Sequence, residues 1–415
     1  MKRTLKKAAM TAALAVLVGA APVQAQKEPI KFGLLQDFTA VYTFVTSGYN
    51  QGQRDYLTLV NEMGGIDGHP IEVTVVDTGN QPQRGIEAYN RVRRDGAILV
   101  DFLSTPVANA MVNRVLEDEV VMLTVMHGRG DASDGETFPF VFPLMAHYWS
   151  QAALLVEYID LYEGGIEGKK IAHVHIDSPF GREPIPVLQE LAKQKGFTLR
   201  TFPYASPGNE QSATWTEVRR FRPDHVFIWG AGGGQAVSVR EAIRNGISPD
   251  KILSVVWLAE SDMHNVGADI AKGVKRFEAT VTGTDTPILQ EIMEKVVKAG
   301  KSAGDAKEVG NTYYNIGVAS MAITVEGARL ALKEFGAPLT GDKLRRGIEM
   351  IKDFDAQGLI PPVSYSSKDH QGGGFGRVSQ WNGKSWEPVS DWHNAYQDLV
   401  WEKIRQEAAE FKKGR

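Results

Sequence analysis

Short apolar runs that alternate with helical patterns constrain the fold of this 415-residue chain more than any other feature. Several runs are hydrophobic nearly throughout, which is typical of strands buried on both faces of a parallel sheet. Between them, apolar residues recur at the spacings of three and four that mark one face of a helix. Repeated strand–helix–strand units predict right-handed crossovers and open α/β sheets.

The predicted strands are Ile30–Leu35, Ile71–Asp77, Ala97–Leu103, Val120–Val125, Ile171–Asp177, Phe197–Pro203, His225–Trp229, Ile252–Leu258, Arg276–Val281 and, late in the chain, Gly376–Trp381 and Trp386–Val389. The predicted helices are Gly52–Met63, Gly85–Arg94, Ala108–Leu116, Gln151–Tyr162, Ile185–Lys195, Ala236–Asn245, Tyr313–Glu334, Gly341–Ile351 and His393–Arg415.

These strands are too many for one small sheet, and the series restarts near Lys169–Ile176 after a long helix. A chain of this length is also expected to form two domains. We therefore predict two α/β lobes that face each other. Ligands bind beyond the carboxyl ends of strands in such sheets, so functional residues should follow the first-lobe strand ends Leu35, Leu103 and Val125 and the second-lobe ends Asp177, Trp229 and Leu258.

The first 25 residues have the pattern of a secretory signal peptide, with an expected cleavage after Ala25. A basic start precedes the apolar run Ala8–Ala21, which is too short for a membrane-spanning helix of roughly 20 residues. A membrane anchor is the alternative interpretation. The chain contains no cysteine, which excludes a lipid-modified cysteine at the cleavage site, disulfides and cysteine-ligated metal sites.

The charge of the chain argues against nucleic acid or an anionic membrane surface as a partner. The net charge is −4, and removal of the four basic residues of 1–25, a segment without acidic residues, leaves −8. An acidic protein lacks the electrostatic footprint that such partners require.

Four segments, in this order and spacing, resemble the leucine/isoleucine/valine-binding proteins of ABC transporters, which have the type I periplasmic binding protein fold. They read NEMGGIDGHPIEVTVVDTGNQPQRGIEAYNRV, STPVANAMVNRVLEDEVVMLT, IAHVHIDSPFGREPIPVLQELAKQKG and FRPDHVFIWGAGGGQAVSVREAIRNG. The resemblance implies a periplasmic substrate-binding protein that delivers a small solute to the permease of an ABC importer. We expect a monomer without cofactor.

The resemblance also implies that the chain crosses a three-strand hinge, near Pro143–His147, Val274–Ala279 and Ile351–Asp355. The implied organisation is a signal peptide at 1–25, a first lobe at 26–145 and 276–352, and a second lobe at 146–275 and 353–415, which includes the C-terminal helix. The lobes of such proteins close over the ligand by a hinge motion.

Candidate ligand-binding residues in the first lobe follow predicted strands. Ser104 and Thr105 open a helix, where hydroxyls, free N–H groups and the helix dipole suit a carboxylate; an ordinary helix cap is the alternative. Met126, His127 and Gly128 follow the next strand, in a loop that the family uses on the carboxylate. His127 is equally well explained as a structural hydrogen-bonding group.

Aromatic residues of the predicted first loop are further candidates for the pocket wall, namely Phe38, Tyr42 and Phe44. Loops are normally polar, so we expect three aromatic side chains in one loop to be buried, either in the pocket wall or elsewhere. Burial against the rest of the first lobe is as good an explanation. Arg129 is a further candidate for an anionic group, with a surface salt bridge as its alternative.

Candidates in the second lobe begin with Phe180, which matches a family tyrosine that covers the ligand, although a core aromatic is the alternative. Trp229 ends a strand, and Gly232 stands where amino-acid binders often carry a tyrosine, although a tight turn that needs glycine is the alternative. Glu260 matches a family glutamate that binds an α-ammonium group, with a solvated loop residue or a pair with Arg182 as its alternatives. Asp262 is a weaker candidate for the same role.

These candidates leave the solute open. Ser104, Thr105 and Glu260 together favour an amino acid, branched-chain or other, whereas the aromatic candidates and Gly232 favour an aromatic carboxylate or a small amide. A secreted α/β enzyme is less well supported, because neither a catalytic motif nor a complete nucleotide fingerprint is present. A sensor module of this fold is a third hypothesis. His173 and His175 lack a third partner, so we expect no metal site.

Overall fold

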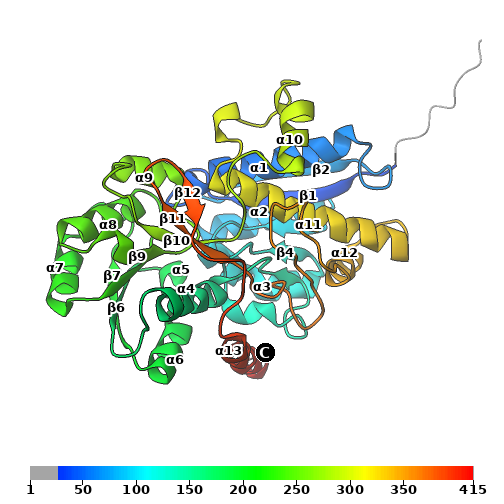
Figure 1. The fold of residues 1–415 in the computed structure, drawn as a ribbon. Helices are drawn as coiled ribbons and strands as arrows, with labels where there is room; N and C mark the ends of the chain where they lie inside the picture. The colour runs from blue at the N-terminus through cyan, green and yellow to red at the C-terminus, as the bar shows by residue number, and fades with distance from the viewer. Residues whose placement is uncertain (1–26, 415) are drawn as a thin grey trace, which may run out of the picture.

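The computed structural model describes residues 27–414, which form two α/β lobes (Figure 1). The first lobe is built on a parallel five-stranded sheet in the order β2-β1-β3-β4-β5. Its strands are β1 Ile30–Gln36, β2 Ile71–Asp77, β3 Leu99–Asp101, β4 Val121–Leu123 and β5 Val141–Phe142. Its helices are α1 Thr43–Glu62, α2 Pro82–Arg94, α3 Thr105–Asp118, α10 Pro287–Ile292, α11 Thr312–Phe335 and α12 Gly341–Glu349.

The second lobe contains a seven-stranded sheet in the order β12-β11-β10-β9-β8-β6-β7, in which β11 is antiparallel to both of its neighbours. Its strands are β6 Lys170–Ile176, β7 Thr198–Tyr204, β8 His225–Trp229, β9 Ile252–Ser254, β10 Lys275–Glu278, β11 Arg377–Trp381 and β12 Trp386–Pro388. Its helices are α4 Tyr148–Tyr162, α5 Pro179–Arg182, α6 Ile185–Lys195, α7 Ser212–Phe221, α8 Gly233–Arg244 and α9 Glu260–Val266, and a last helix, α13 Gln397–Lys413, ends the chain.

Two glycines bring α1 and α11 into direct backbone contact. A Cβ atom on Gly52 would lie 2.1 Å from the carbonyl oxygen of Tyr314, and one on Gly317 would lie 2.1 Å from that of Tyr49. No side chain fits at either point, so each glycine permits the close approach of the other helix. This contact fixes α1, whose first residues face the space between the lobes.

Buried polar groups tie the same helix to the sheet. The carboxylate of Asp101 on β3 accepts hydrogen bonds from Tyr49 Oη at 2.8 Å, Gln53 Nε2 at 2.6 Å and Gln36 Nε2 at 3.2 Å. Burial raises the pKa of Asp101 to about 6, and the three donors oppose that shift. Paired in this way, a buried carboxylate is tolerated in the core.

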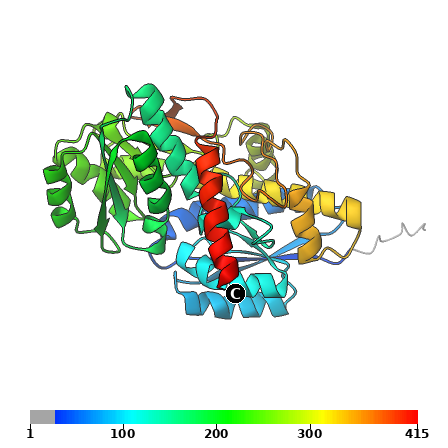
Figure 2. The ribbon, with the colours of Figure 1, turned by 90° about the horizontal axis from the view of Figure 1, so that it is seen from below.

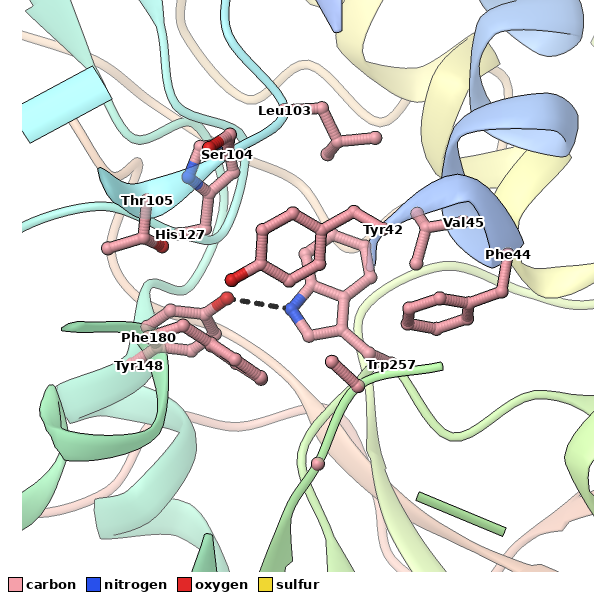
Figure 3. A pocket seen from close by; sticks show the side chains of 12 residues that line it. Tyr42, Phe44, Val45, Leu103, Ser104, Thr105, His127, Tyr148, Phe180 and Trp257 are labelled. Atoms are coloured by element: carbon pink, nitrogen blue, oxygen red, sulfur yellow. Dashed lines mark hydrogen bonds between the residues drawn. The ribbon is translucent and has the colours of Figure 1, made fainter. Parts of the chain in front are cut away.

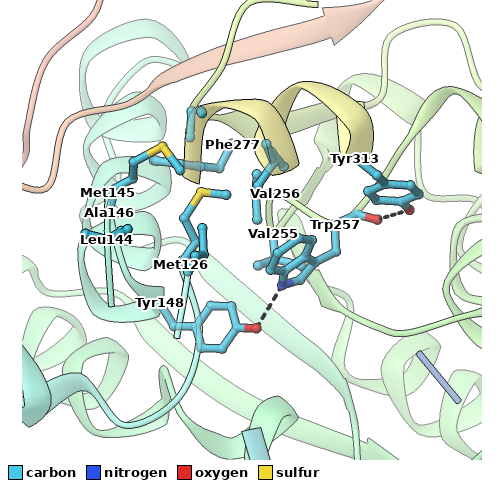
Figure 4. Packing of buried hydrophobic residues seen from close by; sticks show 14 of the residues in the cluster. Met126, Leu144, Met145, Ala146, Tyr148, Val255, Val256, Trp257, Phe277 and Tyr313 are labelled. Atoms are coloured by element: carbon cyan, nitrogen blue, oxygen red, sulfur yellow. Dashed lines mark hydrogen bonds between the residues drawn. The ribbon is translucent and has the colours of Figure 1, made fainter. Parts of the chain in front are cut away.

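The hydrophobic core continues from one lobe into the other through the hinge. Met126, Leu144 and Met145 from the first-lobe side pack in one cluster with Val256 and Phe277 from the second (Figure 4). A smaller cluster fills the space between the first sheet and its helices α2 and α3. No helix within residues 27–414 has the length and apolarity needed to cross a lipid bilayer.

The predicted two-lobed α/β class is observed, but several element limits are wrong. β9 ends at Ser254 rather than Leu258, and α1 begins at Thr43 rather than Gly52, so Tyr42 and Phe44 of the predicted aromatic first loop lie at the cap and in the first turn of α1. The strand β5 and the helices α5, α7, α9 and α10 were not predicted. The predicted signal peptide lies outside the described residues.

The lobe boundaries also differ from those expected. β10 pairs with β9 and β11, so the second lobe extends to Glu278, beyond the expected limit at 275. Part of 353–415 contacts the first lobe: His370 donates its N–H to Ser133 O at 2.9 Å and stacks on Phe142 with ring centroids 3.9 Å apart. Helix α13 contacts both lobes.

Candidate functional site

A pocket lies between the lobes, with about 310 Å³ of space that protein atoms do not fill (Figure 3). It is bounded by the start of α1, the β3–α3 junction and the loop after β4 on one side. The start of α4, the helix α5 and the loops after β8 and β9 bound it on the other. Its lining residues are Tyr42, Phe44, Val45, Leu103, Ser104, Thr105, His127, Tyr148, Phe180, Gly230, Ala231 and Trp257.

The N-terminus of α3 supplies most of the polar groups on the first-lobe side. Ser104 Oγ accepts a hydrogen bond from Val107 N at 3.3 Å and donates one to Asn80 Oδ1 at 2.6 Å. Ser104 is therefore the cap of this helix, which was the alternative to a ligand role. Pro106 has no N–H group, so Thr105 is the residue through which this helix end can donate to an anion.

His127 is the most distinctive polar group of the pocket. Its side chain is 2% exposed, and neither ring nitrogen has a hydrogen-bond partner among the described residues. Burial lowers its pKa to about 3, so the ring is neutral at physiological pH, with one N–H donor and one acceptor nitrogen. A buried polar group without a partner is costly, and a solute with a polar end would remove that cost.

Aromatic rings from both lobes form the walls. Tyr42, which caps α1, meets Phe180 of the second lobe edge to face with ring centroids 6.2 Å apart, and Phe180 also contacts Tyr148 at 5.2 Å. Trp257 Nε1 donates to Tyr148 Oη at 2.8 Å, and Trp257 O accepts from Tyr313 Oη at 2.7 Å. Hydrogen bonds thus hold both the indole and the backbone carbonyl of Trp257; Figure 4 shows both bonds and Figure 3 the first.

The acidic candidates of the second lobe, Glu260 and Asp262, do not line the pocket. Glu260 instead accepts hydrogen bonds from Thr312 Oγ1 at 2.8 Å and Thr312 N at 3.3 Å, at the N-terminus of α11 in the other lobe. Asp262 is buried and accepts from Ala259 N at 2.9 Å and Gln235 Nε2 at 3.1 Å. Burial raises the pKa of Asp262 to about 6. The lining residues include no carboxylate.

Five other candidates lie beside the pocket rather than in its lining. Phe38 is half-buried, with its N–H donated to Asp77. Met126 lies in the hinge core, and Gly128 N donates to Thr105 Oγ1 at 3.4 Å. Trp229 packs behind Tyr148 at 5.8 Å, and Gly232, with φ of 57°, borders a separate surface depression together with Phe44.

Arg129 does not line the pocket but forms an ion pair with Asp131, whose carboxylate is buried rather than on the surface. Its guanidinium donates two hydrogen bonds of 2.6 Å to Asp131. His173 and His175 stack at 5.0 Å inside the second lobe, and burial lowers the pKa of His173 to about 3. No group of three or more His, Asp or Glu side chains within residues 27–414 is arranged to hold a metal ion.

Six lining residues were not predicted from the sequence. Trp257 was assigned to the strand Ile252–Leu258, and the early end of β9 at Ser254 places it in the loop instead. Tyr148 lies at the first turn of α4, directly after a predicted hinge crossing, and this position could have indicated it. The others are Val45, Leu103, Gly230 and Ala231.

Comparisons with known proteins agree with this geometry. The chain is 22% identical over 208 residues to "Leu/Ile/Val-binding protein homolog 3" of Brucella melitensis, an alignment that spans 49% of this chain and 56% of that protein. A crystal structure described as an ABC transporter permease from the Pseudomonas fluorescens group is 35% identical, covers 93% of this chain and 97% of its own, and superposes with a TM-score of 0.85.

A branched-chain amino acid ABC transporter protein of Thermus thermophilus, solved with bound valine, has the same fold. Its TM-score is 0.79 at 19% identity, over 91% of this chain and 99% of that one. The expected type I periplasmic binding fold is thereby confirmed. Residues 29–385 match the family model described as periplasmic binding protein. The chain therefore belongs to the periplasmic binding protein family, whose members bind solutes and are not enzymes.

Proposed function

We propose that this protein is the substrate-binding component of an ABC importer and captures a small carboxylate-bearing solute with an apolar side group. The observation that carries the proposal is a pocket whose walls come from both lobes, with Tyr42 facing Phe180 across it. A helix N-terminus and an unpartnered neutral histidine supply its polar end. Thr105 and His127 bind the acid group, and the rings enclose the remainder.

The size of the pocket limits the solute. The unfilled space of about 310 Å³ includes solvent at the mouth of the pocket, so the enclosed part is smaller than this figure. We therefore propose a small solute, such as an amino acid or an acid with a single ring, and expect the lobes to separate for its entry.

A branched-chain amino acid is the first candidate, since relatives of this chain are described as Leu/Ile/Val-binding or contain valine. An aromatic carboxylate is the second candidate. It is favoured by the absence of a carboxylate from the lining and by five aromatic rings, those of Tyr42, Phe44, Tyr148, Phe180 and Trp257. An α-ammonium group buried without an anionic partner would be costly.

Membership of the family also supports a place in the periplasm and a permease as partner. We propose that residues 1–25 direct export and are removed after Ala25. Mass spectrometry of protein from the periplasmic fraction would measure this directly, and a mass that includes residues 1–25 would contradict it.

The ligand assignment is tested by a thermal-shift screen with leucine, isoleucine, valine, phenylalanine, benzoate and 3-phenylpropanoate. A ligand present at 100 times its Kd stabilises the native state by about 2.7 kcal/mol, which is readily measured. The double variant Ser104→Ala/Thr105→Ala should lose most of the shift produced by the best compound.

Thr340→Ala is the matched control, because Thr340 caps α12 through Lys343 N away from the pocket. It removes a helix cap without touching the site and should keep the ligand-induced shift. The proposal fails if no carboxylate stabilises the protein, or if the control loses the shift as fully as the double variant.

A further inference from the structure

Helix α13 spans the boundary between the lobes. Figure 2 shows it (red) between the helices of the second lobe and those of the first. It contacts α4 of the second lobe and the short 3₁₀ helix Gly130–Ser133 of the first. A two-lobed protein that opens at a hinge must accommodate any element attached to both of its lobes.

The beginning of α13 is fixed to the second lobe. Tyr396 Oη donates to Asp160 Oδ2 at 3.1 Å, and Lys195 Nζ lies 4.4 Å from the centre of the Tyr396 ring. His393 is within 3.0 Å of Glu157 on α4. Val400 and Ile404, both fully buried, belong to the large hydrophobic core cluster.

The end of α13 is attached to the first lobe. Phe411 lies against Phe138 with ring centroids 4.5 Å apart, and the guanidinium of Arg129 lies 4.6 Å from the centre of Phe411 and 5.0 Å from that of Phe138. Ala408 is 1% exposed within the smaller core cluster of the first lobe. Two hydrogen bonds to Asp131 fix the guanidinium of Arg129, against which the Phe411 ring packs.

We propose that α13 is a clasp that restrains separation of the lobes. The helix is attached to the second lobe through Tyr396, His393 and α4. It is attached to the first lobe through Phe411, Ala408 and the 3₁₀ helix Gly130–Ser133. Opening of the pocket strains these attachments, whichever solute binds, and the contact of Phe411 with Phe138 and Arg129 is one that a single substitution removes.

The absence of native cysteine makes the test direct. Arg94 on α2 and Arg219 on α7 are exposed and lie in different lobes, so Arg94→Cys and Arg219→Cys give two sites for spin labels. The distance distribution between the labels, measured by pulsed EPR on ligand-free protein, reports the open fraction. Phe411→Ala should raise that fraction about two- to tenfold, the range expected for loss of one aromatic pair.

Phe335→Ala is the matched control. Phe335 ends α11 and contacts the guanidinium of Arg346, 3.9 Å from the ring centre, within the first lobe. The same substitution there removes a ring beside an arginine without touching α13, and the open fraction should stay unchanged. A truncation that deletes residues 408–415 should match or exceed the effect of Phe411→Ala and serves if that variant fails to fold.

An unchanged open fraction in both Phe411→Ala and the truncation would overturn the clasp. So would an equal rise in Phe335→Ala, since the effect would then be a general loosening of the first lobe. A rise confined to the α13 variants supports it.

Discussion

Glu183 gives the protein a pH dependence that can be worked out from its contacts. Glu183 Oε1 accepts a hydrogen bond from Gly130 N at 2.7 Å, from the second lobe to the first. Burial raises the pKa of this carboxyl to about 8, and the nearby charge of Asp131 adds to the shift. In the unfolded chain a glutamate titrates near 4.3.

The sign follows from proton binding. Between the two pKa values the native state holds a proton on Glu183 that the unfolded state has lost, so stability falls as pH rises. The contribution of Glu183 to stability is complete below about pH 4 and is lost progressively until the pH passes about 8. Buried histidines act in the opposite direction at lower pH, because burial lowers the pKa of His127 to about 3 and that of His147 to about 4. The interval from pH 7 to pH 8 is therefore the informative one.

The expected magnitude is modest but measurable. Native Glu183 is about nine-tenths protonated at pH 7 and half protonated at pH 8, an average of about three-quarters of a proton, and one proton per pH unit is worth about 1.4 kcal/mol. The free energy of unfolding should therefore fall by about 1 kcal/mol over this interval. Urea unfolding followed by tryptophan fluorescence at pH 7.0, 7.5 and 8.0 measures it.

Glu183→Gln keeps the shape of the protonated side chain and removes the titration, so its stability should change by about 1 kcal/mol less than that of the natural protein over the same interval. Glu117→Gln, on the exposed face of α3, is the control and should retain the natural slope. Equal slopes for the natural protein and Glu183→Gln would refute the reasoning.

Two further substitutions test how the pocket is held. Glu260→Gln should cost about 1 kcal/mol in urea unfolding whatever the solute, because the carboxylate serves the N-terminus of α11 through Thr312; unchanged stability with selective loss of amine-bearing ligands would instead place Glu260 on the ligand. Trp257→Phe keeps a ring but removes the N–H that Tyr148 Oη accepts, so the best solute of the screen should bind about fivefold more weakly by calorimetry; unchanged affinity would show that this bond does not shape the pocket.

The sequence was sufficient for the fold class because parallel strands buried on both faces have an unmistakable pattern. It also identified six of the lining residues, among them Ser104, His127 and Phe180, because they follow strands whose carboxyl ends meet. It missed Trp257, since Val255, Val256 and Leu258 continue the apolar run past the true end of β9 and are buried without being strand. Periodicity does not separate a buried loop from a buried strand.

The role of Glu260 shows a different limit. Its position after β9 led us to expect a ligand-binding role in the cleft between the lobes. Its hydrogen bonds depend on Thr312, which is distant in the sequence and begins a helix of the other lobe. No local pattern reveals such a partner. The same holds for α13, whose charged amphipathic sequence predicts a helix but not contacts on both lobes.

The reciprocal contact at Gly52 and Gly317 has a mechanical consequence. Two backbones in direct contact cannot slide without collision, and packed interiors transmit displacement rather than absorb it. Tyr42, Phe44 and Val45 stand at the head of α1 and therefore move as one body with the long helix α11. Adaptation to solutes of different shape consequently falls to the opposite wall, where Phe180 and the glycine-bearing loop after β8 belong to shorter elements.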